Sequence, residues 1–538
     1  MTLAKHFLGI DVGTGSARAG VFDAKGTMLA SAKRDIALYR EAGDIVEQSS
    51  NDIWRAVAAS VREAVAKAGV EAASITGIGY DATCSLVVLG EGGLPLPVGP
   101  TDEAERNIIV WMDHRATEQA ARINRTGEAV LNYVGGAISP EMETPKLLWL
   151  AEHKPETFGR AWQFLDLTDF LTWKSTGSLA RSVCTVTCKW TYLAHEQRWD
   201  EHYFRTVGLG ALADEAFRRI GTEVVSAGTP LGAGLTAEAA RDLGLVEGTP
   251  VAAGLIDAHA GGIGTVGARG GAGTVSSRMA YVFGTSACTM STTTEPAFVD
   301  GVWGPYFSAM VPGLWLNEGG QSAAGAAIDH LVRMHPASAE AAARAGEAGA
   351  SLGQWLADEA GKRGGMEAVP GLVGKLHVVP EFLGNRAPFA DPEALGLIAG
   401  IGMDDGLEGL VGLYLAGVCG LGYGARQIVG VLADKGVATD TIVVSGGAGQ
   451  SPLVRQLLAD TTGLTVAAST SPEPVLLGSA ILGAVAAGQF ADVAGAMAAM
   501  SELGETYPPN AAHAGWHAKR FQAFELLQKA GRAIRDDA

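Results

Sequence analysis

The chain carries one short pattern twice: an apolar strand, a glycine–threonine turn with a serine beside it, and a second strand. The first copy spans residues 10–18 (IDVGTGSAR) and the second spans residues 281–290 (YVFGTSACTM). Each copy predicts a β-hairpin whose turn presents backbone N–H groups next to hydroxyl side chains, and such a turn can bind phosphate oxygens. The repeat therefore predicts two hairpins, one near the start of each half, that face each other across a cleft and clamp a polyphosphate.

A third glycine-rich segment, residues 446–450 (GGAGQ), lies between a strand predicted over residues 440–445 and a helix that begins near Ser451. Glycines at such a position allow a flat base to approach the backbone, and a helix N-terminus favours anions. The sequence does not contain the GxxxxGK pattern of a Walker loop. Asp11, at the end of the first predicted strand, can hold Mg²⁺, usually through water.

Strands and helices alternate in the N-terminal part of the chain. Residues 7–12, 17–22 and 27–32 predict a three-stranded meander, and apolar residues every four positions from Ile53 to Val65 predict an amphipathic helix. This alternation favours an α/β architecture. Further along the chain, we expect a helical, Ala-rich insertion over residues 338–364 and a terminal amphipathic helix over residues 515–535.

The composition of the chain disfavours some classes of binding partner. The 538 residues predict two large domains or three to four smaller ones, and the net charge of −18 repels the backbone of nucleic acids. The N-terminus has no basic region followed by a long apolar run, so we expect no signal peptide and a cytoplasmic protein. Two uncharged stretches, residues 409–425 and 474–491, approach membrane-spanning length, but their Gly and Ala content favours buried helices and no membrane association.

Five cysteines are too few for a disulfide framework in a chain of this length. Cys184 and Cys188 suggest a metal site, but they alternate with Val186 as if along a strand that faces a core. On that prediction, Thr187 and Lys189 share the opposite face and form a polar cleft wall.

In their order along the chain, these motifs resemble the FGGY carbohydrate kinases of the actin/hexokinase-like superfamily. Residues 83–87 (TCSLV) resemble a signature of the D-ribulokinase branch. The resemblance implies two actin/hexokinase-like (ribonuclease H-like) α/β domains with a nucleotide and sugar cleft between them. The expected boundaries are 1–270, 271–503 and a helical tail over 504–538. Other segments that carry the resemblance are residues 111–115 (WMDHR), 145–149 (PKLLW), 318–322 (EGGQS) and 384–392 (GNRAPFADP).

The resemblance implies an ATP- and Mg²⁺-dependent kinase for a small-molecule ketopentose, with D-ribulose converted to D-ribulose 5-phosphate. Asp257 matches the family's catalytic base, which accepts the proton of the sugar's primary hydroxyl. The resemblance also implies that Asp11 holds the Mg²⁺ through water. The residues implied in nucleotide binding are Gly13, Thr14, Gly15, Gly284, Thr285, Ser286, Gly446, Gly447 and Gln450.

The resemblance also implies the sugar site: Ala82 (through its main chain), Trp111, Lys189 and Glu318 match positions that L-ribulokinases use for ribulose. The Trp111 ring fits a core position equally well. A solvated surface lysine is the alternative for Lys189, although its apolar neighbours disfavour it.

Three acidic or histidine positions near these motifs leave alternatives open. Asp113 can bind another sugar hydroxyl or pair with Arg115. His114 and His259 suggest a metal, but their spacing provides no ligand set, so structural histidines are favoured. No role is assigned to Glu473.

Other substrates of the family remain alternatives: L-ribulose, xylulose, glycerol or another polyol. A different class of protein, a non-catalytic sugar sensor or assembly protein on the same scaffold, is disfavoured because Asp11 and Asp257 are both present. A homodimer is expected because many relatives are dimers.

Overall fold

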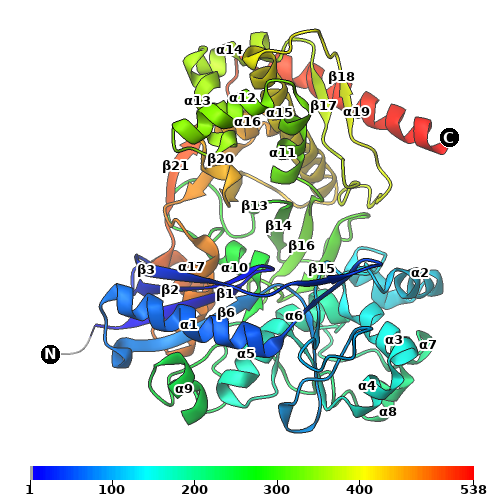
Figure 1. The fold of residues 1–538 in the computed structure, drawn as a ribbon, viewed down its shortest axis with the longest axis vertical. Helices are drawn as coiled ribbons and strands as arrows, with labels where there is room; N and C mark the ends of the chain where they lie inside the picture. Colours follow the sequence, from blue (N-terminus) through cyan, green and yellow to red (C-terminus); the bar gives the residue numbers. More distant parts are fainter. Residues whose placement is uncertain (1–3, 538) are drawn as a thin grey trace.

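The computed structural model describes residues 4–537 and has two lobes, each built around a mixed β-sheet (Figure 1). The strand order is β12-β6-β1-β2-β3 in the first sheet and β15-β16-β14-β13-β19-β20-β21 in the second. The first sheet contains β1 (His6–Val12), β2 (Ser16–Asp23), β3 (Met28–Asp35), β6 (Ile75–Ala82) and β12 (Leu255–Ile256). The second contains β13 (Arg278–Phe283), β14 (Ala287–Thr293), β15 (Trp303–Phe307), β16 (Trp315–Gln321), β19 (Thr441–Ser445), β20 (Thr465–Ser469) and β21 (Leu503–Tyr507). The predicted two-domain α/β class is confirmed.

The two sheets repeat one plan. β1 pairs antiparallel with β2 and parallel with β6, and β13 pairs antiparallel with β14 and parallel with β19. The turns of the two hairpins match as well: the Gly13 N–H donates to the Ser16 carbonyl at 3.0 Å, and the Gly284 N–H donates to the Ser286 carbonyl at 2.9 Å. The internal repeat predicted from the Gly-Thr turns is therefore present in the backbone.

Three parallel strands of the first sheet end at the same edge. Asp11 on β1 lies beside Asp81 on β6, and Leu255 on β12 lies on the other side of Asp81. Asp257 follows two residues later as the first residue of α10 (Asp257–Ile263). Because ligands of α/β sheets bind beyond the carboxyl ends of the strands, this edge is where a site is expected.

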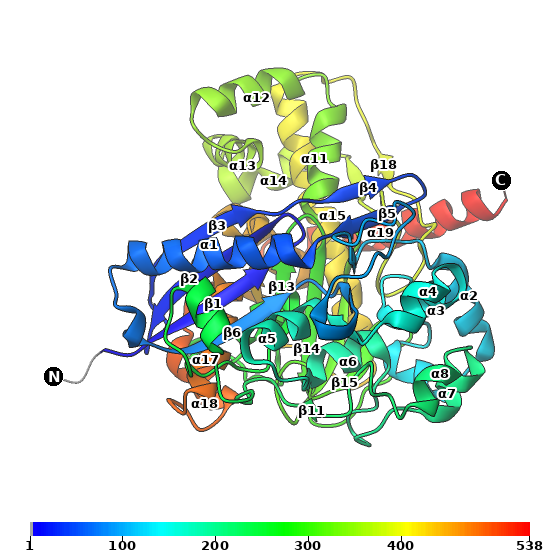
Figure 2. The ribbon, with the colours of Figure 1, turned by 60° about the horizontal axis from the view of Figure 1, so that its bottom comes forward.

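Helix α17 (Pro474–Ala486) packs against β1 and β6 although it comes from the C-terminal half of the chain (Figures 1 and 2). Glycines permit a backbone contact there, since a Cβ on Gly9 would lie 1.9 Å from the Leu476 carbonyl oxygen and one on Gly79 would lie 1.9 Å from that of Ser479. The helix belongs by sequence to the expected C-terminal domain, 271–503, and in the structure it packs on the first sheet.

The other predicted helices are present with small shifts at their ends. The helix around Ile53 is α1 (Ser50–Ala68), with Ser49 as N-cap, and residues 446–450 lead into α16 (Pro452–Thr462). The predicted insertion forms α12 (Ser338–Glu347) and α13 (Leu352–Lys362), and the tail forms α19 (Ala514–Asp536).

Helix α15 (Leu407–Ala433) is long and apolar enough to cross a membrane by length and composition, but 78% of its most apolar 18-residue window is buried inside the protein. Its neighbours include α11 (Gly325–Met334), α14 (Gly365–Val373) and α16. Residues 409–425 therefore form a core helix, as interpreted from their Gly and Ala content, and α17 is buried likewise.

A further sheet, in the order β4-β5-β8-β7-β9, and several short helices complete the first lobe. These strands are β4 (Tyr39–Glu41), β5 (Ile45–Gln48), β7 (Leu86–Leu89), β8 (Ile108–Ile109) and β9 (Gln163–Asp166). The helices are α2 (Thr117–Thr126), α3 (Glu143–His153), α4 (Pro155–Arg160), α5 (Leu167–Thr176), α7 (Glu201–Thr206), α8 (Gly210–Asp214) and α9 (Ala237–Leu243). The structure also contains two short strand pairs and one more helix. The pairs are β10 (Arg181–Ser182) with β11 (Val224–Val225) and β17 (His377–Val379) with β18 (Leu397–Ala399), and the helix is α18 (Val493–Met500).

Residues 183–190 form a helix, α6 (Val183–Trp190), and not the predicted strand. The Ser182 hydroxyl caps it by accepting a hydrogen bond from the Cys184 N–H at 3.3 Å. Alternating residues in so short a segment do not distinguish a strand from a buried helix, and here the cap decides the outcome. Cys184 and Cys188 consequently lie one turn apart on the same face, and Lys189 is their neighbour on the helix rather than a residue of the opposite face.

The close approach of α17 leads to a stability prediction. Gly9→Ala should lower the midpoint of urea unfolding, because the new Cβ collides with the Leu476 carbonyl and overpacking costs about 1–3 kcal/mol. Gly430→Ala is the matched control: this exposed helical glycine has nothing within 4 Å of a Cβ, so stability should stay the same or rise. Equal midpoints for Gly9→Ala and the unmodified chain would contradict the backbone contact.

Candidate active site

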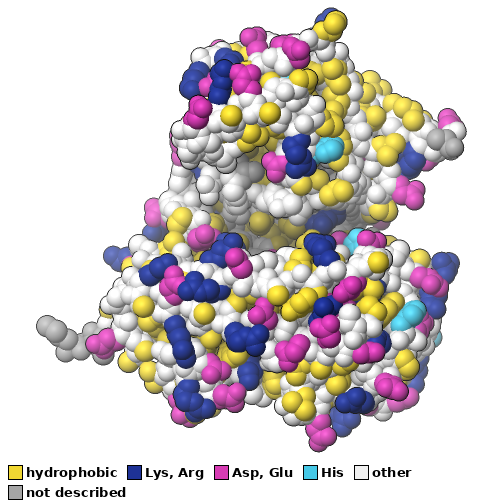
Figure 3. Space-filling view, in the orientation of Figure 1, with side chains coloured by type: hydrophobic (Ala, Val, Ile, Leu, Met, Phe, Trp, Pro, Cys, Tyr) yellow, Lys and Arg dark blue, Asp and Glu magenta, His cyan; other side chains and the backbone are white. Residues whose placement is uncertain are grey.

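A cavity of about 290 Å³ opens between the two lobes, where the space-filling view shows a hollow (Figure 3). Both lobes contribute to its wall, and so do both Gly-Thr hairpins. The predicted site residues on this wall are Asp11, Gly13, Thr14, Trp111, Lys189, Asp257, Gly284, Thr285, Ser286 and Glu318. Residues that are more than 240 positions apart in sequence are thus brought together, as the two-hairpin hypothesis predicts.

Asp257 is the acid–base candidate. It lies in the first turn of α10, where one carboxylate oxygen accepts a hydrogen bond from the Ala258 N–H at 2.7 Å. Burial, together with the negative charge of Asp11, raises the pKa of Asp257 to about 6. A carboxylate with this pKa is ionised at neutral pH and is a stronger base than an ordinary aspartate.

Asp11 forms an ion pair with Arg18, which lies on the return strand of the first hairpin. The other end of the Arg18 guanidinium binds Glu473 at 3.0 Å, just before α17. Arg18 therefore puts a positive charge at the entrance to the first hairpin, on the cavity wall.

The donor set beside Asp11 suits Mg²⁺, which prefers carboxylate oxygens and water. Asp11 and Asp257 both face the cavity, and Asp81 lies behind them with its Oδ1 atom buried and without a hydrogen-bond partner. Burial and the adjacent Asp11 raise the pKa of Asp81 well above its usual value, and its other oxygen accepts a 2.5 Å hydrogen bond from Ser479. Asp11 and Asp257 are thus the carboxylates available to a cation.

Lys189 is buried, with only 4% of its surface exposed, and its ammonium lies 4.5 Å from the centre of the Trp303 ring. Among the described residues, the ammonium has no protein hydrogen-bond acceptor, although it faces the cavity. Burial would lower the pKa of Lys189, but Cys84 and the Glu318 carboxylate outweigh it and raise the pKa well above its usual value. A charged donor is therefore held free for a ligand, and the alternative of a solvated surface lysine is wrong.

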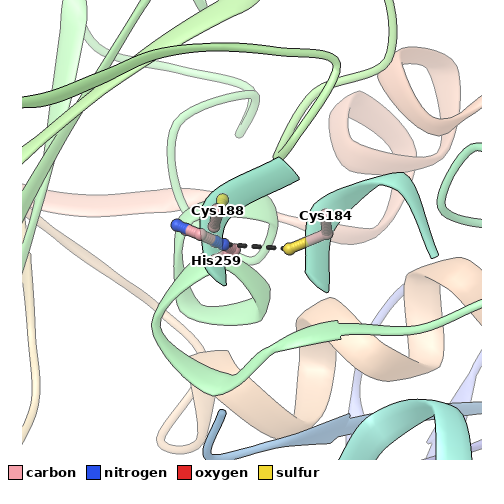
Figure 4. Close-up of side chains that lie close together, drawn as sticks. All are labelled: Cys184, Cys188 and His259. Carbon is pink, nitrogen blue, oxygen red and sulfur yellow. Dashed lines mark hydrogen bonds between the residues drawn. The ribbon is translucent and has the colours of Figure 1, made fainter. Parts of the chain in front are cut away.

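Glu318, on β16, accepts a hydrogen bond from His259 at 3.3 Å, and the other ring nitrogen of His259 lies 3.0 Å from the Cys184 sulfur. Figure 4 shows the side chain of His259, which lies on α10, with its contact to Cys184 on α6. Although burial opposes both shifts, contact with Cys184 and Glu318 raises the pKa of His259 to about 10, while Lys189 and His259 lower that of Glu318 to about 2. Both ring nitrogens of His259 are in contact with protein groups, and the histidine holds the Glu318 carboxylate toward the cavity.

Trp111 lines the cavity and also packs against the hydrophobic core. Its indole N–H donates to the Thr14 hydroxyl at 2.9 Å, and its backbone N–H donates to the Ser85 hydroxyl at 3.1 Å. The same tryptophan therefore touches both the predicted sugar region and the first phosphate hairpin.

Asp113 does not bind a hydroxyl in this cavity. Its carboxylate is fully buried, pairs with Arg115 at 2.7 Å and accepts the Val46 N–H at 2.6 Å. The structure thus supports the alternative pairing with Arg115, because the oxygens of Asp113 are already used by the protein. His114 is also outside the cavity wall and lies 3.5 Å from Glu141.

Five further predicted residues are not on the cavity wall: Gly15, Ala82, Gly446, Gly447 and Gln450. Ala82 ends β6, immediately before Thr83, which does line the cavity. Gly446 follows β19, and a Cβ there would lie 2.5 Å from the Phe283 carbonyl oxygen, one residue before the second hairpin turn. The third glycine-rich segment is therefore adjacent to the second hairpin, and its role in adenosine binding stays a prediction.

The wall residues that were not among the predicted site residues include Arg18, Glu141, Trp303 and Arg386, whose side chains are charged or aromatic. Arg386 lies inside the segment 384–392 that carried the family resemblance, and Arg18 lies in the first copy of the repeat, so both had a local signal. Trp303 and Glu141 had none, since only the tertiary fold brings them to the cavity. The guanidinium carbon of Arg386 lies 5.5 Å from the centre of the Trp303 ring, which the Lys189 ammonium also contacts.

Models of the N- and C-terminal domains of the FGGY family of carbohydrate kinases match residues 6–264 and 279–487. The chain belongs to this family. A Homo sapiens FGGY carbohydrate kinase domain-containing protein is 44% identical to it, over 99% of this chain and 98% of that protein. A D-ribulokinase of Saccharomyces cerevisiae is 38% identical, over 90% of this chain and 72% of that protein.

Solved structures of similar fold include xylulose kinase from Rhodospirillum rubrum, with a TM-score of 0.80 and 23% identity over 98% of this chain and 99% of that one. This likeness extends over the whole FGGY fold. The chain is accordingly a carbohydrate kinase with two α/β domains, as the motifs predicted.

The pKa of Asp257 predicts the acid side of the pH profile of this FGGY kinase. Only the ionised carboxylate can accept a proton, so kcat/KM for the sugar should fall as pH drops through about 6, to roughly one tenth of its plateau at about pH 5. Initial rates between about pH 5 and 8 test this, with circular dichroism at each pH to show that the fold persists. A flat profile down to about pH 5 would contradict the assignment.

Proposed function

We propose that this FGGY kinase transfers the γ-phosphate of ATP to the primary hydroxyl of a pentulose, with D-ribulose converted to D-ribulose 5-phosphate. The observation that carries the proposal is the position of Asp257, on one cavity wall with both Gly-Thr hairpins and with Lys189 and Glu318. The 38% identity to a protein named D-ribulokinase supports the choice of sugar.

The sugar would lie against Trp111, with its hydroxyl groups bound by the Lys189 ammonium as donor and the Glu318 carboxylate as acceptor. A buried donor and a buried acceptor in a water-poor pocket favour a polyhydroxylated ligand that can bind both, because the Lys189 ammonium would otherwise stay without a hydrogen-bond partner. His259 prevents the Glu318 carboxylate from rotating away from the cavity, by its 3.3 Å hydrogen bond.

In the chemical step, the primary hydroxyl oxygen of the sugar forms a bond to the γ-phosphorus while the bond to the oxygen of ADP breaks. Asp257 takes the hydroxyl proton, and the N–H groups of the two hairpins stabilise the charge on the phosphate oxygens. Positioning carries most of the catalysis in phosphoryl transfer, so a moderate base is sufficient. Mg²⁺ bound near Asp11 would neutralise phosphate charge when present.

A substrate panel tests the sugar assignment. Coupled measurement of ADP release should give the highest kcat/KM with D-ribulose, compared with L-ribulose, D-xylulose and glycerol, and ³¹P NMR should show the ester on the primary 5-hydroxyl. A preference for another ketose or polyol would overturn the assignment to ribulose while leaving the kinase chemistry. No stimulation of ADP release by any pentulose would overturn the pentulose class.

Asp257→Asn should keep the fold and ATP binding and lose sugar phosphorylation. Removal of a general base costs roughly 10²–10⁴ in rate, so the turnover should fall close to the assay background. Asp300→Asn, at an exposed position, is the matched control and should retain full activity. Rapid turnover by a correctly folded Asp257→Asn variant would remove this carboxylate from the mechanism.

Lys189→Met should impair sugar use much more than nucleotide binding. Methionine can keep the apolar contact with Trp303 but removes the charged donor, and the hydroxyl left unpaired should cost about 1–3 kcal/mol, or roughly ten- to a hundredfold in kcat/KM for ribulose. Kinetics on both substrates and one melting curve measure this, with the exposed Lys435→Met as control. A lower melting temperature with equal losses for both substrates would instead indicate a structural role.

A further inference from the structure

The C-terminal helix α19 meets α16 through a small polar cluster in an otherwise apolar contact. His513 immediately precedes α19, His517 lies one turn later, and Asp460 lies near the end of α16. All three side chains are buried, with exposures of 8%, 1% and 4%. One ligand atom from each residue lies within 4.8 Å of those of the other two.

Each residue of this cluster has one polar side-chain atom without a hydrogen bond. Asp460 Oδ2, His513 Nδ1 and His517 Nε2 are buried and have no hydrogen-bond partner within residues 4–537, although the first two lie 3.6 Å apart. Each unsatisfied buried polar atom costs free energy, so three of them around one point suggest a missing ligand. Ligand atoms of a tetrahedral zinc ion lie about 3.3 Å apart, and the Asp460–His513 spacing is already close to this value.

The protein fixes the opposite side of two of the three ligands, Asp460 and His517. Asp460 Oδ1 accepts hydrogen bonds of 2.8 Å from the Asn510 N–H and from the Gln456 side chain. His517 Nδ1 lies 2.9 Å from the Tyr423 hydroxyl on α15. Outer contacts of this kind orient metal-binding carboxylates and histidines and select the ring nitrogen that faces the metal.

We propose that Asp460, His513 and His517 bind one Zn²⁺ ion, with a water molecule as fourth ligand, and that this ion joins α19 to α16. A carboxylate and two neutral imidazoles form a common donor set for zinc. None of the three residues lines the catalytic cavity, so the site is independent of the sugar and nucleotide residues.

The charges around the site allow a cation. His517 Nδ1 can donate its proton to the Tyr423 hydroxyl, which leaves the lone pair of Nε2 for a metal. Arg520 directs its guanidinium to the carbonyl groups of Gly374 and Leu376. Asp460 supplies a negative charge to the ligand set.

The test is zinc binding by the full-length protein after treatment with a chelator. Isothermal titration with Zn²⁺ should give one ion per chain, and X-ray absorption should show only nitrogen and oxygen neighbours. His517→Gln and Asp460→Asn should each weaken binding more than about 100-fold, and Tyr423→Phe, which removes only the outer contact, by roughly 10- to 100-fold. Asp460→Asn retains Oδ1 for its two hydrogen bonds, so this variant remains informative if His517→Gln does not fold.

Two control variants separate this site from others. His202→Gln changes an exposed histidine, and Cys184→Ser changes the cluster of Cys184, Cys188 and His259, so both should bind zinc as the unmodified chain does. Sulfur in the absorption spectrum, loss of binding in Cys184→Ser, or unchanged binding in Asp460→Asn would overturn the proposal. Absence of binding to the folded, unmodified chain would overturn it as well.

Discussion

The arrangement of this kinase depends on the direct contact between the backbone of α17 and the strands β1 and β6. Gly9, Gly77 and Gly79 have no side chains, and a Cβ on any of them would lie within 2.1 Å of a carbonyl oxygen of the helix. The contact binds a segment of the C-terminal half to the sheet that carries Asp11. The second hairpin, which belongs to the same half, can therefore face the first across a cavity whose wall includes Val475 of α17.

The interface between α17 and the first sheet also positions the charged groups around Asp11. Ser479 of α17 donates to Asp81, which lies behind Asp11, and Glu473 at the start of the helix holds Arg18, the partner of Asp11. On the other side of the cavity, Lys189, Glu318 and His259 are buried together, and their charges hold one another in the ionised forms. The site thus combines an acidic edge of the sheet, where the phosphoryl group would be transferred, with a buried ion pair that can bind hydroxyl groups.

The sequence predicted the features that depend on local pattern: both hairpins, the α/β class and the buried helix α15. The family resemblance, rather than a local pattern, indicated Asp257, which lines the cavity. The sequence was less informative where tertiary contacts determine the local structure or the partners of a side chain. Residues 183–190 alternate like a strand, yet the Ser182 cap and the surrounding core make them helical. Asp113 has the chemistry of a sugar ligand, but Arg115 and the Val46 N–H occupy its oxygens. Trp303 and Glu141 reach the cavity only through the fold, so no local pattern could indicate them.

The hydrogen bond from the Trp111 indole to Thr14 has a consequence for the order and strength of ligand binding. A sugar that shifts this ring would also shift the hydroxyl at the tip of the first hairpin, and a nucleotide that captures the hydroxyl would act on the ring. Binding free energies are reciprocal, so any factor by which the sugar changes nucleotide affinity must equal the factor by which the nucleotide changes sugar affinity. Through this one hydrogen bond, the binding of either substrate would change the affinity for the other before the phosphoryl group is transferred.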